Sequence, residues 1–387
     1  MSTPTGHQTK IGLYTGKVIA TPASSELMEA FRSAHIESSD SGQATFALTF
    51  QLARNSTGSN FTIYDNSDLT PYSRIIMTAS IDAQSQILID GLITSVDTQP
   101  GTGNNPDTIT VKGSDLSAAM QMHEKSIPWP CMPDFAIVMA LLAQYAFYGI
   151  IPIAIPTIVT AAQTPGMVTK QQSSTDYDYI MQLAQANGYI FRVIPGLTPG
   201  QSFAYFGPPL RAVMRFVAPQ CKTLNLAPTP MGNVQKMNFS VNAEAPEMWG
   251  GMVLDVVDQD SLLVPVASVV PLLPPFAMNP ALPMNLPWVK FKLLEKSKNG
   301  PLTSLALIQG RTDLSAGKYV TAQGTVDVER YRSMLSAPGI VSIRGAGTHH
   351  DGKYCVTHLI SEITPESFKQ TFTLNREGTV SNITMVS

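Results

Sequence analysis

The chain has 387 residues, so we expect two or three domains with hydrophobic cores of their own. Charged residues make up only 14% of it and the net charge is −3, which argues against nucleic-acid binding, because that activity needs clustered lysine and arginine. The three cysteines, Cys131, Cys221 and Cys355, are far apart and fit a reducing compartment without a disulfide framework. Met1–Lys10 has no apolar core, which indicates that no cleaved signal peptide directs secretion.

Residues 1–120 predict a first β domain. Residues 11–20 are typical of a short strand, and Ser24 or Ser25 can cap a short helix. In residues 45–52, apolar and polar side chains alternate, which predicts a half-buried strand. Further strands are predicted at 74–81, 86–96 and 108–111.

Residues 121–205 predict a small mixed α/β domain. Its uncharged run, Phe135–Thr169, must be tested as a membrane span. Asp134 can cap a helix that Gly149 ends, and about 14 helical residues would span about 21 Å, which is short of the roughly 30 Å hydrocarbon core. We therefore expect a buried helix and no membrane span.

A second helix follows in the same region. Thr175 with Asp178 resembles a capping box, apolar residues recur at helical spacing, and Gly188 suits the residue after the helix. Asp176 and Asp178 at the helix start complement the helix dipole, so they need no catalytic role.

Residues 206–387 predict a second β domain, interrupted by a proline-rich apolar insertion at about 256–289. Ser261–Val289 carries no charge and cannot be a helix, because each interior proline costs about 3 kcal/mol. Its many apolar residues also argue against a solvated linker. Two interpretations stay open: a loop folded over its own domain, or an extended arm that docks on a neighbouring subunit or baseplate partner.

The last forty residues predict a compact antiparallel meander of three strands. Asp351-Gly352 is a turn signal, and Thr364–Glu366 makes the next reversal. Period-2 alternation assigns the faces of the second and third strands. Tyr354, Val356, His358 and Ile360 are expected on one face of the second strand, and Phe368, Phe372 and Leu374 on the inner face of the third.

The same pattern occurs near the other end of the chain. Asp90-Gly91 precedes a strand at 92–96, and the return strand at 108–111 closes on Gly113, as Thr371–Leu374 closes on Gly378. This repetition predicts two related β domains in one chain.

No catalytic, cofactor or metal site is predicted. The only dense cluster of candidate ligands is His349, His350, Asp351, Cys355 and His358. Adjacent histidines would point to opposite faces of a strand, and the Asp-Gly turn accounts for Asp351 without chemistry. Gly345–Gly347 lacks the third glycine of a dinucleotide fingerprint, and neither a phosphate loop nor a nucleophile elbow is present.

Four segments, in order, carry a family resemblance. The chain resembles the late control protein D family, the tail and baseplate hub proteins of contractile phages and contractile injection systems. Thr175–Tyr189 is similar to the family's signature helix, with an acidic and aromatic start before Leu-Ala and a terminal glycine. The other matching segments are Ile87–Thr94, Tyr205–Pro208, and Val341–Gly347 with Phe372–Gly378.

The resemblance implies a mainly β fold with an α+β insertion, in which two tube-type antiparallel β-barrel domains flank the mixed domain. It further implies a non-enzymatic homotrimer, in which six quasi-equivalent domains form a ring that joins a hexameric inner tube to a spike. Because only Thr379–Ser387 follow Gly378, we expect the spike to be a separate protein. Other implied partners are a tube-initiator protein and baseplate wedge proteins.

We expect assembly in the bacterial cytoplasm and incorporation into a phage tail or a phage tail-like injection particle. One alternative is another baseplate or tube-initiator component of the same machine. A hydrolase with β-barrel accessory domains is the alternative from a different class.

Overall fold

The structure is a computed structural model. It describes residues 9–52, 69–82, 84–101, 106–130, 132–156, 170–208, 221–226, 232–257, 260–268, 275–281, 289–294 and 301–381. Of the cysteines, Cys221 and Cys355 form no disulfide, and Cys131 lies outside the described residues. Within these ranges, no helix is both long enough and apolar enough to cross a bilayer.

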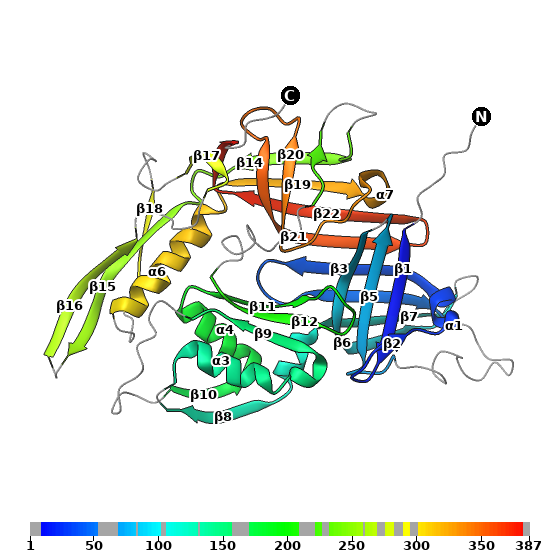
Figure 1. Ribbon diagram of the computed structural model, residues 1–387, viewed down its shortest axis with the longest axis horizontal. Helices are drawn as coiled ribbons and strands as arrows, with labels where there is room; N and C mark the ends of the chain where they lie inside the picture. Colours follow the sequence, from blue (N-terminus) through cyan, green and yellow to red (C-terminus); the bar gives the residue numbers. More distant parts are fainter. Residues whose placement is uncertain are drawn as a thin grey trace.

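A single large sheet of 13 strands organises the molecule (Figure 1). Its main path runs β14-β19-β22-β21-β3-β4-β7-β6-β5-β1-β2, and β20 and β13 continue from β21 on a side branch. Strands from the two ends of the chain thus belong to one hydrogen-bonded sheet. The fold is mainly β, as the sequence predicts.

The first β unit contains β1, β2, β3, β4, β5, β6 and β7, with the short helix α1. Ser24 caps α1 by accepting a hydrogen bond from the Leu27 amide at 3.3 Å. Alternating side chains in β4 bury Phe46, Leu48 and Phe50 on one face, as predicted. The bounds are β1 Lys10–Gly16, β2 Thr21–Pro22, α1 Ser25–Ala30, β3 Phe31–Ser39, β4 Thr45–Gln51, β5 Arg74–Ile81, β6 Gln84–Gln99 and β7 Thr108–Asp115.

The second β unit contains β13, β14, β19, β20, β21, β22 and β23, with the short helix α7. The predicted C-terminal meander is confirmed, and Phe368, Phe372 and Leu374 are buried as expected. The bounds are β13 Leu224–Asn225, β14 Lys236–Val241, β19 Val320–Asp327, α7 Val328–Tyr331, β20 Gly339–Arg344, β21 Gly352–Thr364, β22 Ser367–Arg376 and β23 Gly378–Ser381.

The two β units repeat one strand order. β3-β4-β7-β6-β5 in the first corresponds to β14-β19-β22-β21-β20 in the second. Both long strands, β6 and β21, carry a bulge at a threonine. Thr94 Oγ1 donates to the Lys112 carbonyl at 3.3 Å, and Thr357 Oγ1 donates to the Thr373 carbonyl at 3.2 Å.

A second matched contact fixes the correspondence residue by residue. The hydroxyls of Thr49 and Thr110 lie 3.3 Å apart across β4 and β7, and those of Thr325 and Thr371 lie 3.2 Å apart across β19 and β22. Thr110 pairs with the third residue after the bulge at Thr94, and Thr371 pairs with the third residue after the bulge at Thr357. The repetition therefore includes side-chain contacts as well as topology.

A mixed α/β unit lies between the two β units in the chain. Thr175 caps α4 by accepting from the Asp178 amide at 3.2 Å, and Gly188 after the helix has φ +65°, as the sequence predicts. The bounds are η1 Leu116–Gln121, β8 Glu124–Trp129, α3 Asp134–Ala143, η2 Ala146–Tyr148, β9 Ile150–Ala154, β10 Lys170–Thr175, α4 Asp176–Ala186, β11 Ile190–Pro195 and β12 Ser202–Gly207.

The first helix of this unit differs from expectation at its start. Asp134 is its first helical residue and not its cap, because Pro133 takes the cap position without a side-chain hydrogen bond. The Asp134 carboxylate instead pairs with Lys170 and accepts from Asn187 Nδ2 at 2.7 Å. It therefore ties the helix start to β10 and to the end of α4.

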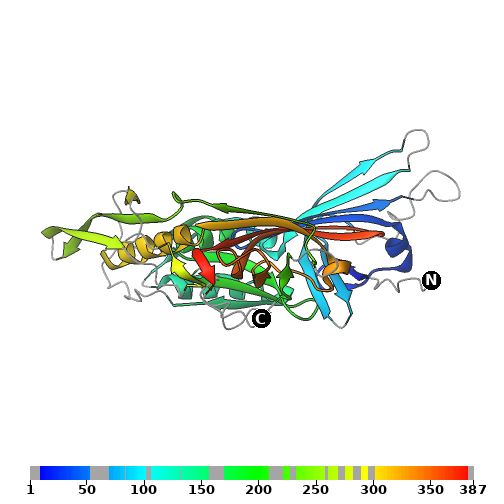
Figure 2. The same ribbon diagram turned by 90° about the horizontal axis from the view of Figure 1, so that it is seen from above.

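The insertion in the second β unit forms an arm, built from the β15–β16 hairpin, β18 and α6 (Figure 1). Figure 2 shows this arm at one end of an elongated molecule and the β6–β7 hairpin at the other. The bounds are β15 Glu247–Val257, β16 Asp260–Ser268, β17 Ala277–Pro280, β18 Lys290–Leu293 and α6 Pro301–Ala316.

The described parts of Ser261–Val289 take two different arrangements, and docking of the segment on a partner stays a prediction. Residues 275–281 fold over their own β unit, where β17 pairs with β23 and the Ala277 amide donates to Glu377 Oε1 at 3.0 Å. β16 instead belongs to the projecting hairpin. Residues 269–274 and 282–288 lie outside the described residues.

Three local predictions are wrong. Asp90-Gly91 does not precede a strand but lies inside one, because β6 passes through it, as predicted for 86–96, and pairs with β5 on one side and β7 on the other. The bulge at Thr357 changes the face of the following residues, so Tyr354 and Val356 are buried while His358 and Ile360 lie on the opposite face. Gly352 is the first residue of β21 and not part of the turn, which spans residues 345–351.

Gly352 nevertheless requires glycine. Its φ is +126°, and a Cβ there would lie 3.0 Å from Arg376 Nη1 and 2.9 Å from Ser381 Oγ. We expect Gly352→Val to lower the free energy of unfolding by about 1–3 kcal/mol or more, since backbone strain of that order adds to the clash. Gly347→Val is the matched control, because Gly347 has φ +87° but nothing within 4 Å. Chemical denaturation that ranks Gly347→Val as the more damaging change would contradict this account.

Candidate assembly surface

The two β units meet where β3 pairs with β21. The antiparallel register is His358 with Ser39, Leu359 with Ser38, Ile360 with Glu37, Ser361 with Ile36, Glu362 with His35, and Ile363 with Ala34. The Asp40 amide extends the ladder by donating to the Thr357 carbonyl at 2.7 Å. We call this contact the intrachain junction.

Apolar packing reinforces the intrachain junction. The core of the first β unit includes Ile363 and Phe368 from the second, next to Ile36 and Phe50. On the opposite face, Glu37 lies 2.8 Å from His358, and both side chains are partly exposed. Exposed ion pairs contribute little, so the shared core and the backbone ladder hold the two units together.

One face of the sheet is largely polar across eight strands, from β14 to β6. Cross-strand partners share a face, so the registers assign it directly. Most of its side chains are uncharged and hydroxyl- or amide-bearing. Its members include Asn238, Ser240, Thr321, Gln323, Thr371, Thr373, His358, Glu362, His35, Glu37, Thr45, Thr49, Thr108, Thr110, Lys112, Ser95 and Asp97.

The two margins of this eight-strand ribbon are open edges. β14 pairs only with β19 among the described strands. On β6, pairing with β5 begins at Leu92, and Ile93 still exchanges hydrogen bonds with Ser73 and Tyr72. Beyond Ile93, no described strand pairs with that side of β6. Open strand edges invite pairing with another chain.

A buried ion pair fixes the mixed unit against the first β unit. Arg74 Nε and Nη2 each donate to Asp90 at 2.7 Å, and both side chains are almost fully buried. Ser202, at the start of β12, donates to the same carboxylate at 2.9 Å. Asp90 therefore links three strands, which explains why an Asp-Gly sequence occurs inside a strand.

Arg192 occupies the point where all three units meet. It is 2% exposed, and its Nη2 donates to the Ala337 carbonyl at 3.3 Å. Burial lowers the pKa of Arg192 to about 10, while the charges of Asp115 and Asp40 act in the opposite direction. Burial in turn raises the pKa of both carboxyl groups. No feature of the sequence alone singled out this residue.

The structure disperses the candidate ligand cluster of the second β unit. His350 stacks on Phe239 at 4.5 Å between ring centroids, and the His349 carbonyl accepts from Arg376 at 2.6 Å. His358 faces Glu37, whereas Cys355 is buried against Phe276 and Ile340. Within the described residues, no group of three potential ligands could hold a metal ion.

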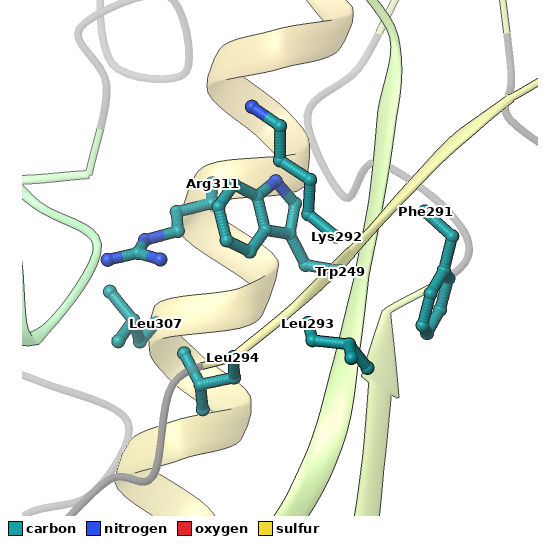
Figure 3. Close-up of a pocket in the computed structure, with 7 residues that line it drawn as sticks. All are labelled: Trp249, Phe291, Lys292, Leu293, Leu294, Leu307 and Arg311. Carbon is teal, nitrogen blue, oxygen red and sulfur yellow. The ribbon is translucent and has the colours of Figure 1, made fainter.

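A pocket of about 680 Å³ lies on the arm, between β18, β15 and α6 (Figure 3). Trp249 is flanked by Arg311 at 4.6 Å and Lys292 at 5.3 Å from its ring. Glu247 accepts from the Trp249 indole at 3.1 Å and pairs with Lys292 at 2.6 Å. The polar and charged groups that line the pocket therefore pair with one another, and their contacts connect α6 to β15 and β18.

The Asp90 contact generates a prediction. Asp90→Ala should lower the free energy of unfolding by about 3–5 kcal/mol, because it leaves the Arg74 cation buried without its partner. The exposed Lys290–Glu244 pair provides the control, and Glu244→Ala should leave the unfolding midpoint unchanged. Thermal unfolding of both variants checks the difference. Equal midpoints for Asp90→Ala and the unmodified chain would show that this contact does not stabilise the fold.

No family model and no curated protein matches the sequence. Solved structures do match: a tail protein from Neisseria meningitidis MC58 has a TM-score of 0.59 and 13% identity, over 96% of this chain and 98% of that one. The 43 kDa tail protein of prophage MuSo2 from Shewanella oneidensis has a TM-score of 0.57 and 14% identity, over 95% and 98%.

A third match is the E. coli c3393 protein, described as a component of the type VI secretion system with structural similarity to T4 tail proteins. Its TM-score is 0.53 at 10% identity, over 91% of this chain and 76% of that one. The alignments extend over nearly the whole chain. The chain therefore has the fold of phage tail proteins and of a type VI secretion component.

Proposed function

We propose that the chain is the structural hub of a contractile tail or injection-system baseplate, in which three copies join a hexameric inner tube to a trimeric spike. The observation that carries this proposal is the repeated β unit. Three chains with two equivalent units each present six similar sheets, which can match a six-subunit tube. The resemblance of four sequence segments to late control protein D proteins and the fold shared with tail proteins support it.

The polar face suits the inner wall of such a ring. The other face of the same strands is buried in the cores of the two units, so the polar face is the one left for a lumen. Its threonine, serine, asparagine and glutamine side chains give a wettable wall, and its charges are of both signs, as in Lys369 beside Glu362 and Lys112 beside Asp97. Such a wall would bind passing macromolecules weakly.

The repeated unit also favours this role over a tube initiator. A six-fold ring of single-unit chains would need no duplication, whereas a three-fold ring needs two units in each chain. The hydrolase alternative has no supporting side-chain arrangement in the described residues, where the candidate cluster is dispersed. We propose a non-enzymatic role, with residues 1–120, 121–205 and 206–387 as the three domains.

We further propose that the arm contacts the baseplate wedge proteins that surround the hub. On β18, Phe291 and Leu293 are 56% and 70% exposed, and Figure 3 shows Phe291 directed away from α6. Large exposed apolar side chains close together are typical of protein contacts.

The arm proposal predicts a separation of folding from assembly. The double variant Phe291→Ser, Leu293→Ser should retain its unfolding midpoint but enter assembled particles at least several-fold less often. Leu197→Ser is the control, because Leu197 is 95% exposed on the mixed unit, between β11 and β12. Quantitative incorporation into particles measures both. Normal incorporation of the double variant would remove the arm from the assembly interface.

The trimer prediction is tested by mass. Native mass spectrometry of the chain purified together with its spike should show three copies of the chain, with three-fold symmetry in electron micrographs. A hexamer would favour the tube initiator, and a stable monomer in that mixture would refute the hub.

A further inference from the structure

The intrachain junction joins two strands whose counterparts each have one side with no partner among the described strands. By the repetition, β3 corresponds to β14 and β21 corresponds to β6. In the intrachain junction, β3 pairs with the part of β21 that follows the bulge at Thr357. The equivalent part of β6 follows the bulge at Thr94, and it is there that no described strand pairs with one side of β6.

The matched contacts transfer the register from one unit to the other. The bulges equate Thr94 with Thr357, so Asp97 corresponds to Ile360. The threonine pairs equate Thr49 with Thr325, so Glu37 corresponds to Ser240 through the β3–β4 and β14–β19 registers. Ile360 pairs with Glu37 in the intrachain junction.

We propose that β14 of one chain pairs with β6 of a second copy, antiparallel and in the register of the intrachain junction. This inference rests on the proposed hub function and specifies its subunit interface. The pairs between the two copies are Ser95 with Asn242, Val96 with Val241, Asp97 with Ser240, and Gln99 with Asn238. Repeated three times, this contact closes a ring in which every junction between units is of one kind.

The side chains at these edges fit the pairing. Val241 is 48% exposed at the end of β14, and Val96 is partly buried on β6, so the register places two β-branched apolar side chains opposite each other. The polar residues Ser240 and Asn238 meet Asp97 and Gln99 on the polar face. A shift by one residue would place the valines opposite polar side chains.

Disulfide trapping tests the register. The double variant Asp97→Cys, Ser240→Cys should form disulfides between chains and yield a covalent trimer on a denaturing gel after mild oxidation. Asp97→Cys, Asn238→Cys is the register control, because both positions lie on the same face but two residues out of line. Glu37→Cys, Ile360→Cys reports the same geometry within one chain, by loss of free thiols without a change in mass. The unmodified chain, with its three native cysteines, sets the background.

Each outcome separates the interface from the hub function. A covalent trimer from the Ser240 pair alone supports the register. If native mass spectrometry shows a trimer and the Glu37–Ile360 pair forms its disulfide, but the Ser240 pair does not, the register is wrong while the hub proposal stands. Preferential trapping of the Asn238 pair also overturns the register. A chain that stays monomeric with its spike refutes the hub and this interface together.

Discussion

The fold depends on the backbone ladder between β3 and β21. These strands lie more than 300 residues apart in the chain, and their pairing turns two local meanders into one sheet. Without it, each unit would expose an open strand edge with unsatisfied amide and carbonyl groups. The ladder also brings Ile363 and Phe368 into the core of the first β unit. The backbone ladder and the shared core therefore join the two β units directly at this contact.

The mixed unit is attached through buried charge rather than through the sheet. Asp90 accepts from Arg74 and Ser202, and Arg192 lies where all three units meet. Removing one partner from such a contact is far more costly than removing an exposed pair. Buried polar contacts also demand one geometry, so they fix the orientation of the mixed unit relative to the first β unit. The arm, by contrast, projects from the body, and its helix α6 packs against the end of α4, where Gly310 lies beside Gly188 (Figure 1).

Duplication explains why so much of the sheet is polar on one face. Each unit buries one face of its strands in its own core, and the registers keep the other faces in line across the intrachain junction. The threonine bulges help, because each reverses the alternation of faces along a long strand at the same point of the repeat. The result is a ribbon with the same chemistry from β14 to β6.

The sequence by itself determined the local elements whose signals are local. Alternation in β4 and β22, the Thr175 cap of α4 and the C-terminal meander were predictable because period and capping depend on near neighbours. The repetition of the β units was also predictable from the sequence. Tertiary structure decided what depends on distant partners. Asp90-Gly91 is a turn-type sequence, but it lies inside β6, where Arg74 and Ser202 both donate to the Asp90 carboxylate. The bulge that places Ile360 on the polar face is set by the pairing of β21 with β22. The intrachain junction and the buried Arg192 were equally out of reach, since neither a strand's partner nor a side chain's burial is encoded within a short window of sequence.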